Sequence, residues 1–204
     1  MLQPKHFLVP FSYVFHPIFS SIYGALFFFL FTSAFSHTLA FYVTFLQIAV
    51  YTVVLPLLFY AILRTTKAIH SFTEASLQER KNPIFIQLVL FYALVDFGII
   101  KQTFPELHLF FTGGFVSTFL VLAVTTFGYK ASLHMIGIAS LFQFVLMFSS
   151  YFNLDTTYTV AFLMICMGCV ASSRLYLKSH TPFELIVGML IGILPQYAVW
   201  FYRI

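Results

Sequence analysis

The last apolar run of the chain, Leu185–Tyr202, reads LIVGMLIGILPQYAVWFY and contains no charged residue. A helix that crosses the hydrocarbon core of a bilayer needs roughly 17–25 mostly apolar residues, so this run predicts a transmembrane helix. Earlier parts of the chain carry runs of the same kind. We expect spans at Pro17–Phe35, Leu39–Leu63, Ile84–Ile100, Leu109–Phe127, Met135–Tyr151, Tyr158–Ala171 (extending toward Arg174) and Leu185–Tyr202.

The composition leads to the same class of protein. Of the 204 residues, 61% are hydrophobic and 8% are charged, and the mean hydropathy is +0.96. A soluble domain carries about 25% charged residues, and a chain of this size has too little interior to hide such an apolar excess from water. A soluble enzyme, a disordered tail and a nucleic-acid module are therefore excluded. We predict an all-α polytopic transmembrane bundle of about six to seven spans, with residues 1–204 forming a single domain.

The few charges are distributed unevenly between the two sides of the membrane that these spans imply. The side that carries the N-terminus holds Lys5, Arg64, Lys67, Arg80, Lys81, Lys130, Arg174 and Lys178. The other side holds Lys101 and Arg203. Cytoplasmic loops are enriched in Lys and Arg, but five of the eight cations lie in segments that are also suited to bind an anion. The orientation therefore stays open.

Three polar clusters end on the cation-rich side. They are Glu79–Pro83 (ERKNP), Lys130–His134 (KASLH) and Ser172–Glu184 (SSRLYLKSHTPFE). Connectors that share one side of a bundle can meet in space, and together these supply several cations, two imidazoles and small hydroxyl groups. Such groups can hold a phosphate, attack it and protonate its leaving group.

The third cluster has the spacing S-R-x5-H-x3-E, counted from Ser173 and Arg174 to His180 and Glu184. This spacing resembles the third signature of the type-2 phosphatidic acid phosphatase superfamily, S-R-x5-H-x3-D, which includes lipid phosphate phosphatases and polyprenyl diphosphate phosphatases. Upstream, the stretch 132–134 (SLH) resembles the end of the second signature, P-S-G-H. The resemblance covers residues 64–204 as a phosphatase-like core, while residues 1–63 hold the first two spans.

The resemblance implies a role for each matching residue. His180 would be the nucleophile that forms a phosphohistidine intermediate, and Glu184 would replace the aspartate that orients it. His134 would be the general acid for the leaving oxygen. The phosphate-binding residues would be Arg174, Ser132, Lys130, Arg80 and Lys81. Lys130 fits a membrane anchor equally well.

The chain also departs from the family pattern, which makes it a divergent member. Leu133 stands where the second signature has glycine, and Ala131 stands where it has proline. The first signature, K-x6-R-P, is absent as such, and Glu79–Pro83 is its best positional substitute. The expected reaction is hydrolysis of a phosphomonoester or diphosphate on a lipid without metal or other cofactor. The expected setting is a multi-pass protein of a bacterial inner membrane, whose partners are membrane lipid and the phosphorylated lipid substrate.

Several of these residues also have purely structural explanations. Thr181, Pro182 and Glu184 form the pattern of a helix capping box, and Ser132 suits the N-cap of the following span. Ser71 and Glu74 suggest a second capping box, which would begin a short surface helix that Pro83 ends. Two pairs of small residues, Gly188 with Gly192 and Gly168 with Ser172, are typical of helix-packing notches.

Two rival functions remain. The chain could be a catalytically silent relative that binds a lipid headgroup, or a structural membrane protein. A small transporter is suggested by Asp96, an ionisable residue inside the third expected span with Lys101 as its partner. A metal site built from His134, His180 and Glu184 is opposed by the cations around it.

Overall fold

The computed structural model describes residues 4–32, 38–67, 69 and 77–203, which form helices and their connections. The elements are α1 (Pro4–Val14), α2 (Pro17–Phe31), α3 (Leu39–Ala49), the π-helical turn η1 (Val50–Val54), α4 (Leu55–Thr65), α5 (Leu77–Phe97), α6 (Ile100–Thr103), α7 (Pro105–Thr126), α8 (Leu133–Phe152), α9 (Thr157–Tyr176) and α10 (Pro182–Tyr202). Proline at the first position of α2, α7 and α10 presets the helical backbone where no intrahelical N–H is required.

Within the described residues, five helices are long and apolar enough to cross a membrane. The first of them is the continuous stretch Leu39–Thr65, which comprises α3, η1 and α4. The bent pair formed by α1 and α2, with an angle of 67° between its two parts, raises the number to six if it counts as one span. The prediction of an all-helical, multi-pass membrane protein is therefore confirmed.

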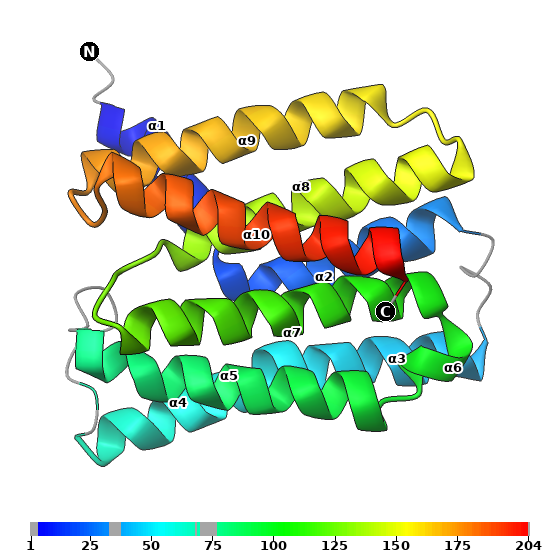
Figure 1. The fold of residues 1–204 in the computed structure, drawn as a ribbon, viewed down its shortest axis with the longest axis horizontal. Helices are drawn as coiled ribbons and strands as arrows, with labels where there is room; N and C mark the ends of the chain where they lie inside the picture. The colour runs from blue at the N-terminus through cyan, green and yellow to red at the C-terminus, as the bar shows by residue number, and fades with distance from the viewer. Residues whose placement is uncertain (1–3, 33–37, 68, 70–76, 204) are drawn as a thin grey trace.

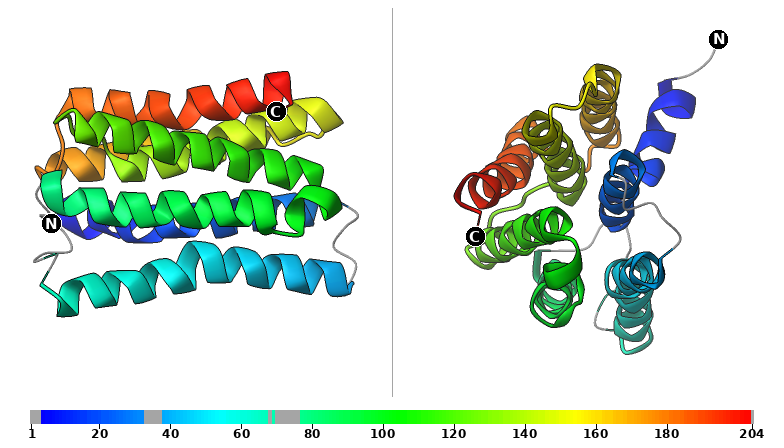
Figure 2. Two further views of the ribbon diagram at one scale, coloured as in Figure 1. Left: turned by 60° about the horizontal axis from the view of Figure 1, so that its bottom comes forward. Right: turned by 90° about the vertical axis from the view of Figure 1, so that its right-hand side faces the viewer.

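Helix α8 lies at the centre of the bundle, where it contacts α10, α2, α9 and α7 (Figure 2). In α8, 61% of the membrane-length window is buried, against 11% in Leu39–Thr65, which lies at the edge of the bundle. The packing of α10 on α8 depends on Gly188 and Gly192, because a Cβ atom on either would come within 2.7 Å of a carbonyl oxygen of α8 or its cap. The predicted packing notch on α10 is thus confirmed.

The predicted notch at Gly168 has a different outcome. A Cβ atom at Gly168 would meet nothing within 4 Å in the described structure, so this glycine makes no tight helix contact there.

The start of α5, the α7–α8 connection and the α9–α10 connection all lie at one end of the bundle, the left-hand end in Figure 1. We call this the cationic end. The α8–α9 connection and the short helix α6 lie at the opposite end, which we call the far end. The alternation of the expected spans therefore places the three polar clusters on one side, as the sequence predicts.

One sequence prediction about a helix boundary is wrong, and one helix was not predicted. Pro83 does not end a surface helix: it lies inside α5, which begins at Leu77, so Arg80 and Lys81 belong to the first turns of a long helix. Pro83 is the seventh residue of α5, so the N–H that it lacks leaves one carbonyl of the first turn without its intrahelical partner. Helix α1 precedes the first expected span and was not predicted. The expected capping box at Ser71 and Glu74 lies outside the described residues.

Candidate functional site at the cationic end

The turn between α9 and α10 sets up the third polar cluster. Helix α9 ends at Tyr176, and Lys178 adopts a left-handed conformation (φ 51°) that lets the backbone N–H of Ser179 donate to the Arg174 carbonyl. This C-terminal motif reverses the chain within a few residues. It leaves Arg174 in the last turn of α9 and brings His180 to the start of α10.

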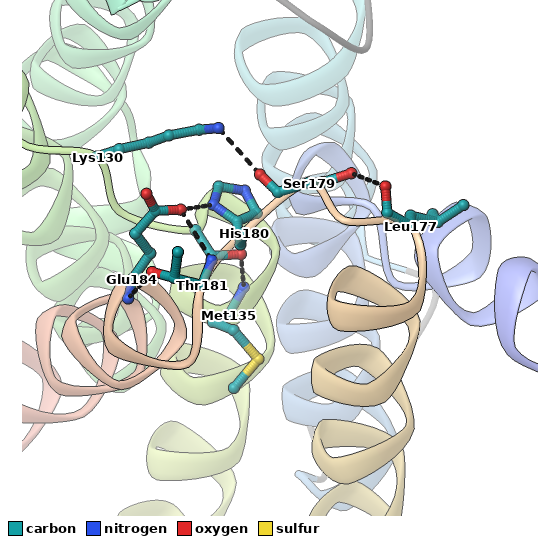
Figure 3. A network of polar contacts seen from close by, with 8 residues as sticks. Lys130, Met135, Leu177, Ser179, His180, Thr181 and Glu184 are labelled. Atoms are coloured by element: carbon teal, nitrogen blue, oxygen red, sulfur yellow. Dashed lines mark hydrogen bonds and ion pairs between the residues drawn. The ribbon is translucent and has the colours of Figure 1, made fainter.

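The Nδ1 atom of His180 lies 2.7 Å from Oε2 of Glu184 (Figure 3). The same oxygen accepts a hydrogen bond from the backbone N–H of Thr181, and the Thr181 hydroxyl accepts one from the Glu184 N–H, which completes a capping box. The capping role and the orienting role of Glu184 therefore coexist. His180 is buried, with 8% of its surface exposed, so the ring is held in one orientation.

Lys130 reaches this turn from the α7–α8 connection. Its Nζ atom donates to the Ser179 carbonyl at 2.9 Å, as Figure 3 shows. A shallow cavity of about 400 Å³ opens here, lined by Lys130, Leu175, Lys178, Ser179, His180, Thr181, Pro182 and Glu184. The cavity brings a histidine and two lysines from two connectors to one surface.

The charges around His180 are predominantly positive. Burial, followed by the neighbouring cations Lys130, Arg80 and Arg174, lowers the pKa of His180 to about 4, while its hydrogen bond to Glu184 acts in the opposite direction. At neutral pH the ring is therefore uncharged. Its contact with Glu184 is then a hydrogen bond from Nδ1–H to a carboxylate, and Nε2 keeps its lone pair.

Lys130 experiences the same surroundings. Burial is the main cause that lowers its pKa, and the positive charge of Arg80 adds to this, whereas Glu184 acts to raise it. Arg80 also interacts electrostatically with Glu184 and with Arg174. Like charges held together and partly buried are costly, and an anion placed among them would relieve that cost.

Arg174 provides a second indication of an anion site. Its Nε atom is buried, and no residue in the described part of the chain accepts a hydrogen bond from it. An arginine N–H in this position loses water without gaining a partner, which costs free energy unless a ligand supplies an acceptor. Arg174 is thus the phosphate-binding prediction that the geometry favours most.

Ser132 lies at the start of α8. It is fully buried, its hydroxyl caps α8 by accepting from the Met135 N–H, and its own N–H donates to the Glu184 carbonyl. Both polar groups are therefore engaged within the fold. The structure favours the N-cap interpretation, and Ser132 instead joins the start of α8 to the start of α10.

The departures from the family's second signature are accommodated in the core. Ala131 is buried, and Leu133 packs against the apolar cluster that contains Ile84, Val121 and Ile191. The bulky side chain that replaces glycine is thus accommodated in apolar packing between α5, α7 and α10.

His134 contacts the N-terminal helix. Its Nε2 atom lies 3.1 Å from the Ser12 carbonyl oxygen, and its ring meets that of His16 edge-on with 5.1 Å between centroids. His134 also lies within electrostatic range of Arg174 and His180. The structure therefore brings His134 close to the other predicted site residues.

Sequence reasoning did not identify the residues that contact or support His134. Ser12 and His16 belong to no motif, and their only sequence signal is Pro17, which begins α2 just after the helix break. The buried Ser173 belongs to the third polar cluster, but its contact with Ser12 has no sequence signal. Among the described contacts, none joins Lys81 to the groups around His180, so its place in the site rests on the sequence alone.

The transporter prediction finds little support. Asp96 lies exposed at the end of α5 and accepts a hydrogen bond from the Tyr92 hydroxyl at 3.2 Å. No ion pair with Lys101 is present among the described contacts. Within residues 4–32, 38–67, 69 and 77–203, no group of three or more His, Cys, Asp or Glu side chains could share a metal ion.

Comparison with known protein families, with curated proteins and with solved structures gave no match to this chain. The resemblance to the phosphatase superfamily therefore rests on the sequence motifs alone.

Proposed function

We propose that this chain is an integral membrane phosphatase that hydrolyses a lipid phosphate or a polyprenyl diphosphate through a phosphohistidine intermediate. The observation that carries the proposal is the 2.7 Å hydrogen bond between Nδ1 of His180 and Oε2 of Glu184. Because the carboxylate holds the ring proton on Nδ1, the Nε2 lone pair is left for attack on phosphorus. This arrangement supports His180 as the nucleophile and Glu184 as its positioning residue.

The surrounding cations suit the charge that develops in such a reaction. As Nε2 of His180 forms a bond to phosphorus and the bond to the leaving oxygen breaks, negative charge collects on the other phosphate oxygens. Arg174, with an Nε–H that no described residue accepts, can bind one of them, and Lys130 and Arg80 can stabilise the others. His134 then gives a proton to the leaving oxygen, and water later releases the phosphate from His180.

The position of the site at one end of the bundle suits a substrate whose tail lies in the bilayer. The proposal includes a phosphorylated lipid as substrate and a bacterial inner membrane as the location. It also includes α5 as a further span, because this helix has 21 residues and packs along α7. The total would then be six to seven spans.

The test is phosphate release by purified protein in detergent micelles, with short- and long-chain lipid phosphates as substrates. We expect His180→Asn to lower the rate by at least about a thousandfold, because the nucleophile is lost. His108→Asn is the matched control, since His108 is a histidine of the far end that bonds to the Val95 carbonyl. Activity retained in His180→Asn would refute the nucleophile assignment, and a wild-type protein without activity on any substrate would refute the phosphatase function.

A second candidate is a catalytically silent protein that binds a phosphorylated headgroup. It is favoured by Ser132, whose N–H donates to the Glu184 carbonyl within the fold and is not left for phosphate. Flotation with vesicles that contain phosphatidic acid distinguishes the two functions. A silent binder would float with these vesicles, lose binding in Arg174→Ala and release no phosphate.

A further inference from the structure

The end of α1 provides an unusual hydrogen-bond acceptor. The last carbonyls of a helix lose their intrahelical partners and must find others. Here the Tyr13 carbonyl accepts from the His16 N–H at 3.3 Å, and the Val14 carbonyl accepts from the Tyr23 hydroxyl at 2.8 Å. The Ser12 carbonyl remains, and it accepts from Nε2 of His134 at 3.1 Å. The break between α1 and α2 therefore provides a hydrogen-bond acceptor for His134, which lies 122 positions further along the chain.

This contact determines which ring nitrogen of His134 carries the proton. A carbonyl oxygen can only accept a hydrogen bond, so Nε2 must be protonated. In the uncharged ring, Nδ1 then holds the lone pair. His180 has the opposite tautomer, because its Nδ1 donates to Glu184 and its Nε2 holds the lone pair.

The end of α1 is anchored against α8 and α9. The Ser12 hydroxyl lies 2.7 Å from that of Ser173, and both residues are buried; Ser173 directly precedes Arg174. Phe15 is buried in the apolar cluster that contains Met135 and Val170, so the bend is packed against α8 and α9. A carbonyl held this firmly can orient a side chain.

His16 supports His134 from the side of α2. Its ring stands edge-on to that of His134 at 85°, and its Nδ1 accepts from the Ile18 N–H, which fixes the ring as the N-cap of α2. The imidazole of His134 is therefore confined between the end of α1 and the start of α2.

We propose that α1 is a positioning element of the cationic-end site: the Ser12 carbonyl and the His16 ring hold His134 so that Nδ1 is the atom that exchanges a proton with substrate and water. The catalytic part of this inference rests on the proposed function. It extends the site into residues 1–63, which the family resemblance does not cover. The two histidines then work through opposite ring atoms, Nε2 in His180 and Nδ1 in His134.

The second chemical step shows what this arrangement does. When water attacks the phosphohistidine, its oxygen forms a bond to phosphorus while the bond from phosphorus to Nε2 of His180 breaks. The electron pair of that bond returns to Nε2, and the proton of the water passes to Nδ1 of His134. In the first step, Nδ1 takes the acidic proton of a monoanionic phosphate substrate and passes it to the leaving oxygen, and after the second step it returns its proton to the phosphate product. Nε2 of His134 keeps its proton on the Ser12 carbonyl throughout.

The first test measures the tautomer directly. Protein labelled with ¹⁵N-histidine is studied by NMR in detergent micelles, and His134→Gln assigns the signals of His134. We expect a protonated Nε2 and an unprotonated Nδ1 at neutral pH. His108, whose Nε2 lies 3.2 Å from the Val95 carbonyl, should show the same pattern and serves as an internal reference. A protonated Nδ1 in His134 would overturn the inference.

The second test separates positioning from folding. His16→Asn keeps a side-chain acceptor for the N-cap of α2 but removes the ring beside His134. We expect kcat to fall about tenfold with KM unchanged, since the orientation of the proton donor is affected and substrate binding is not. Thr38→Asn, which exchanges one N-cap residue for another at the start of α3, is the control and should change neither constant.

An unchanged kcat in His16→Asn would refute the positioning role of that ring. If the wild-type protein releases no phosphate while the expected tautomer is observed, the proposed function fails but the structural role of α1 stands. The two failures are thus distinguishable.

Discussion

The two ends of the bundle carry charge in different ways. At the cationic end, Arg80, Lys130 and Arg174 lie within electrostatic range of one another, and the first two also interact with Glu184. At the far end, charged groups bond locally and separately. Asp155 accepts from Thr157, and Arg203 stacks on the Tyr151 ring at 4.0 Å.

The cavities differ in the same way. The far end has the larger one, about 570 Å³, and it is lined by uncharged residues such as Ser149, Asn153 and Thr156. The cavity at the cationic end, about 400 Å³, is lined by a histidine, a glutamate and two lysines. The volume of a cavity alone therefore does not identify a reactive site. Converging, partly buried charges of one sign do so, because such a cluster is costly unless it serves a ligand.

After the loss of the His180 nucleophile, the largest expected effect concerns the arginines. Arg174→Ala should lower kcat/KM for a lipid phosphate at least about a hundredfold, since a buried N–H donor to the phosphate is lost. Arg203→Ala at the far end should change kcat/KM less than twofold. The measurement is phosphate release over a range of substrate concentrations. Equal effects of the two substitutions would remove the distinction between the ends.

The second prediction concerns pH. The pKa of His180 falls from 6.5 to about 4 on folding, so between these values the unfolded chain binds more protons and stability rises with pH. Acidification from pH 6.5 to 4 should therefore cost up to about 3 kcal/mol of unfolding free energy, and the acid limb of kcat/KM should lie near pH 4. Thermal unfolding in detergent at several pH values measures this cost. His180→Asn should be less sensitive to acid, and an identical loss in that variant would assign the effect to other groups.

The third prediction compares two lysines. Lys130→Met removes a partly buried cation that lines the cavity and donates to the Ser179 carbonyl, and it should lower the rate of phosphate release about tenfold. Lys101→Met removes an exposed cation of the far end and should leave the rate unchanged. A loss of activity in Lys101→Met, or none in Lys130→Met, would contradict the assignment.

The smallest effect is expected at the far end. The hydroxyls of Thr156 and Ser149 share a 2.7 Å hydrogen bond in a buried position, so Thr156→Val should lower the unfolding free energy by about 1 kcal/mol. Thr126→Val, which removes an exposed hydroxyl bonded within its own helix, should cost less. Neither should alter phosphate release; a clear loss of activity in Thr156→Val would show that the far-end cavity takes part in function.

Much of the fold follows from patterns that are local in the sequence. The apolar runs predict α8, α9 and α10, and most of the predicted ends lie within a few residues of the observed ones. The capping pattern at Thr181 also predicts the start of α10. Pro83 misled the prediction because a proline near a helix start has the same sequence signal whether the helix begins before it or after it. Helix α1 was missed because Pro4–Val14 is short, contains Pro10 and precedes a stronger apolar run.

The contacts of the candidate site can likewise be divided into those between residues close in the sequence and those between distant ones. The hydrogen bond from His180 to Glu184 spans four residues, and the motif resemblance implies it. The contact of His134 with the Ser12 carbonyl joins groups 122 residues apart, and no spacing rule reaches that far. The apolar packing of Leu133, likewise, depends on the neighbours that α5, α7 and α10 supply.

The sequence by itself determined that lipid is the solvent of this protein, which runs become helices and which end of the bundle collects the cations. Each of these depends on composition, on periodicity or on the alternation of spans, all of which can be counted along the chain. Only the tertiary structure decided that Ser132 is a cap, that Arg174 keeps an N–H without a described acceptor and that α1 holds His134. The physical reason is that hydrogen bonding and burial depend on distance in space, which is set only when the helices pack.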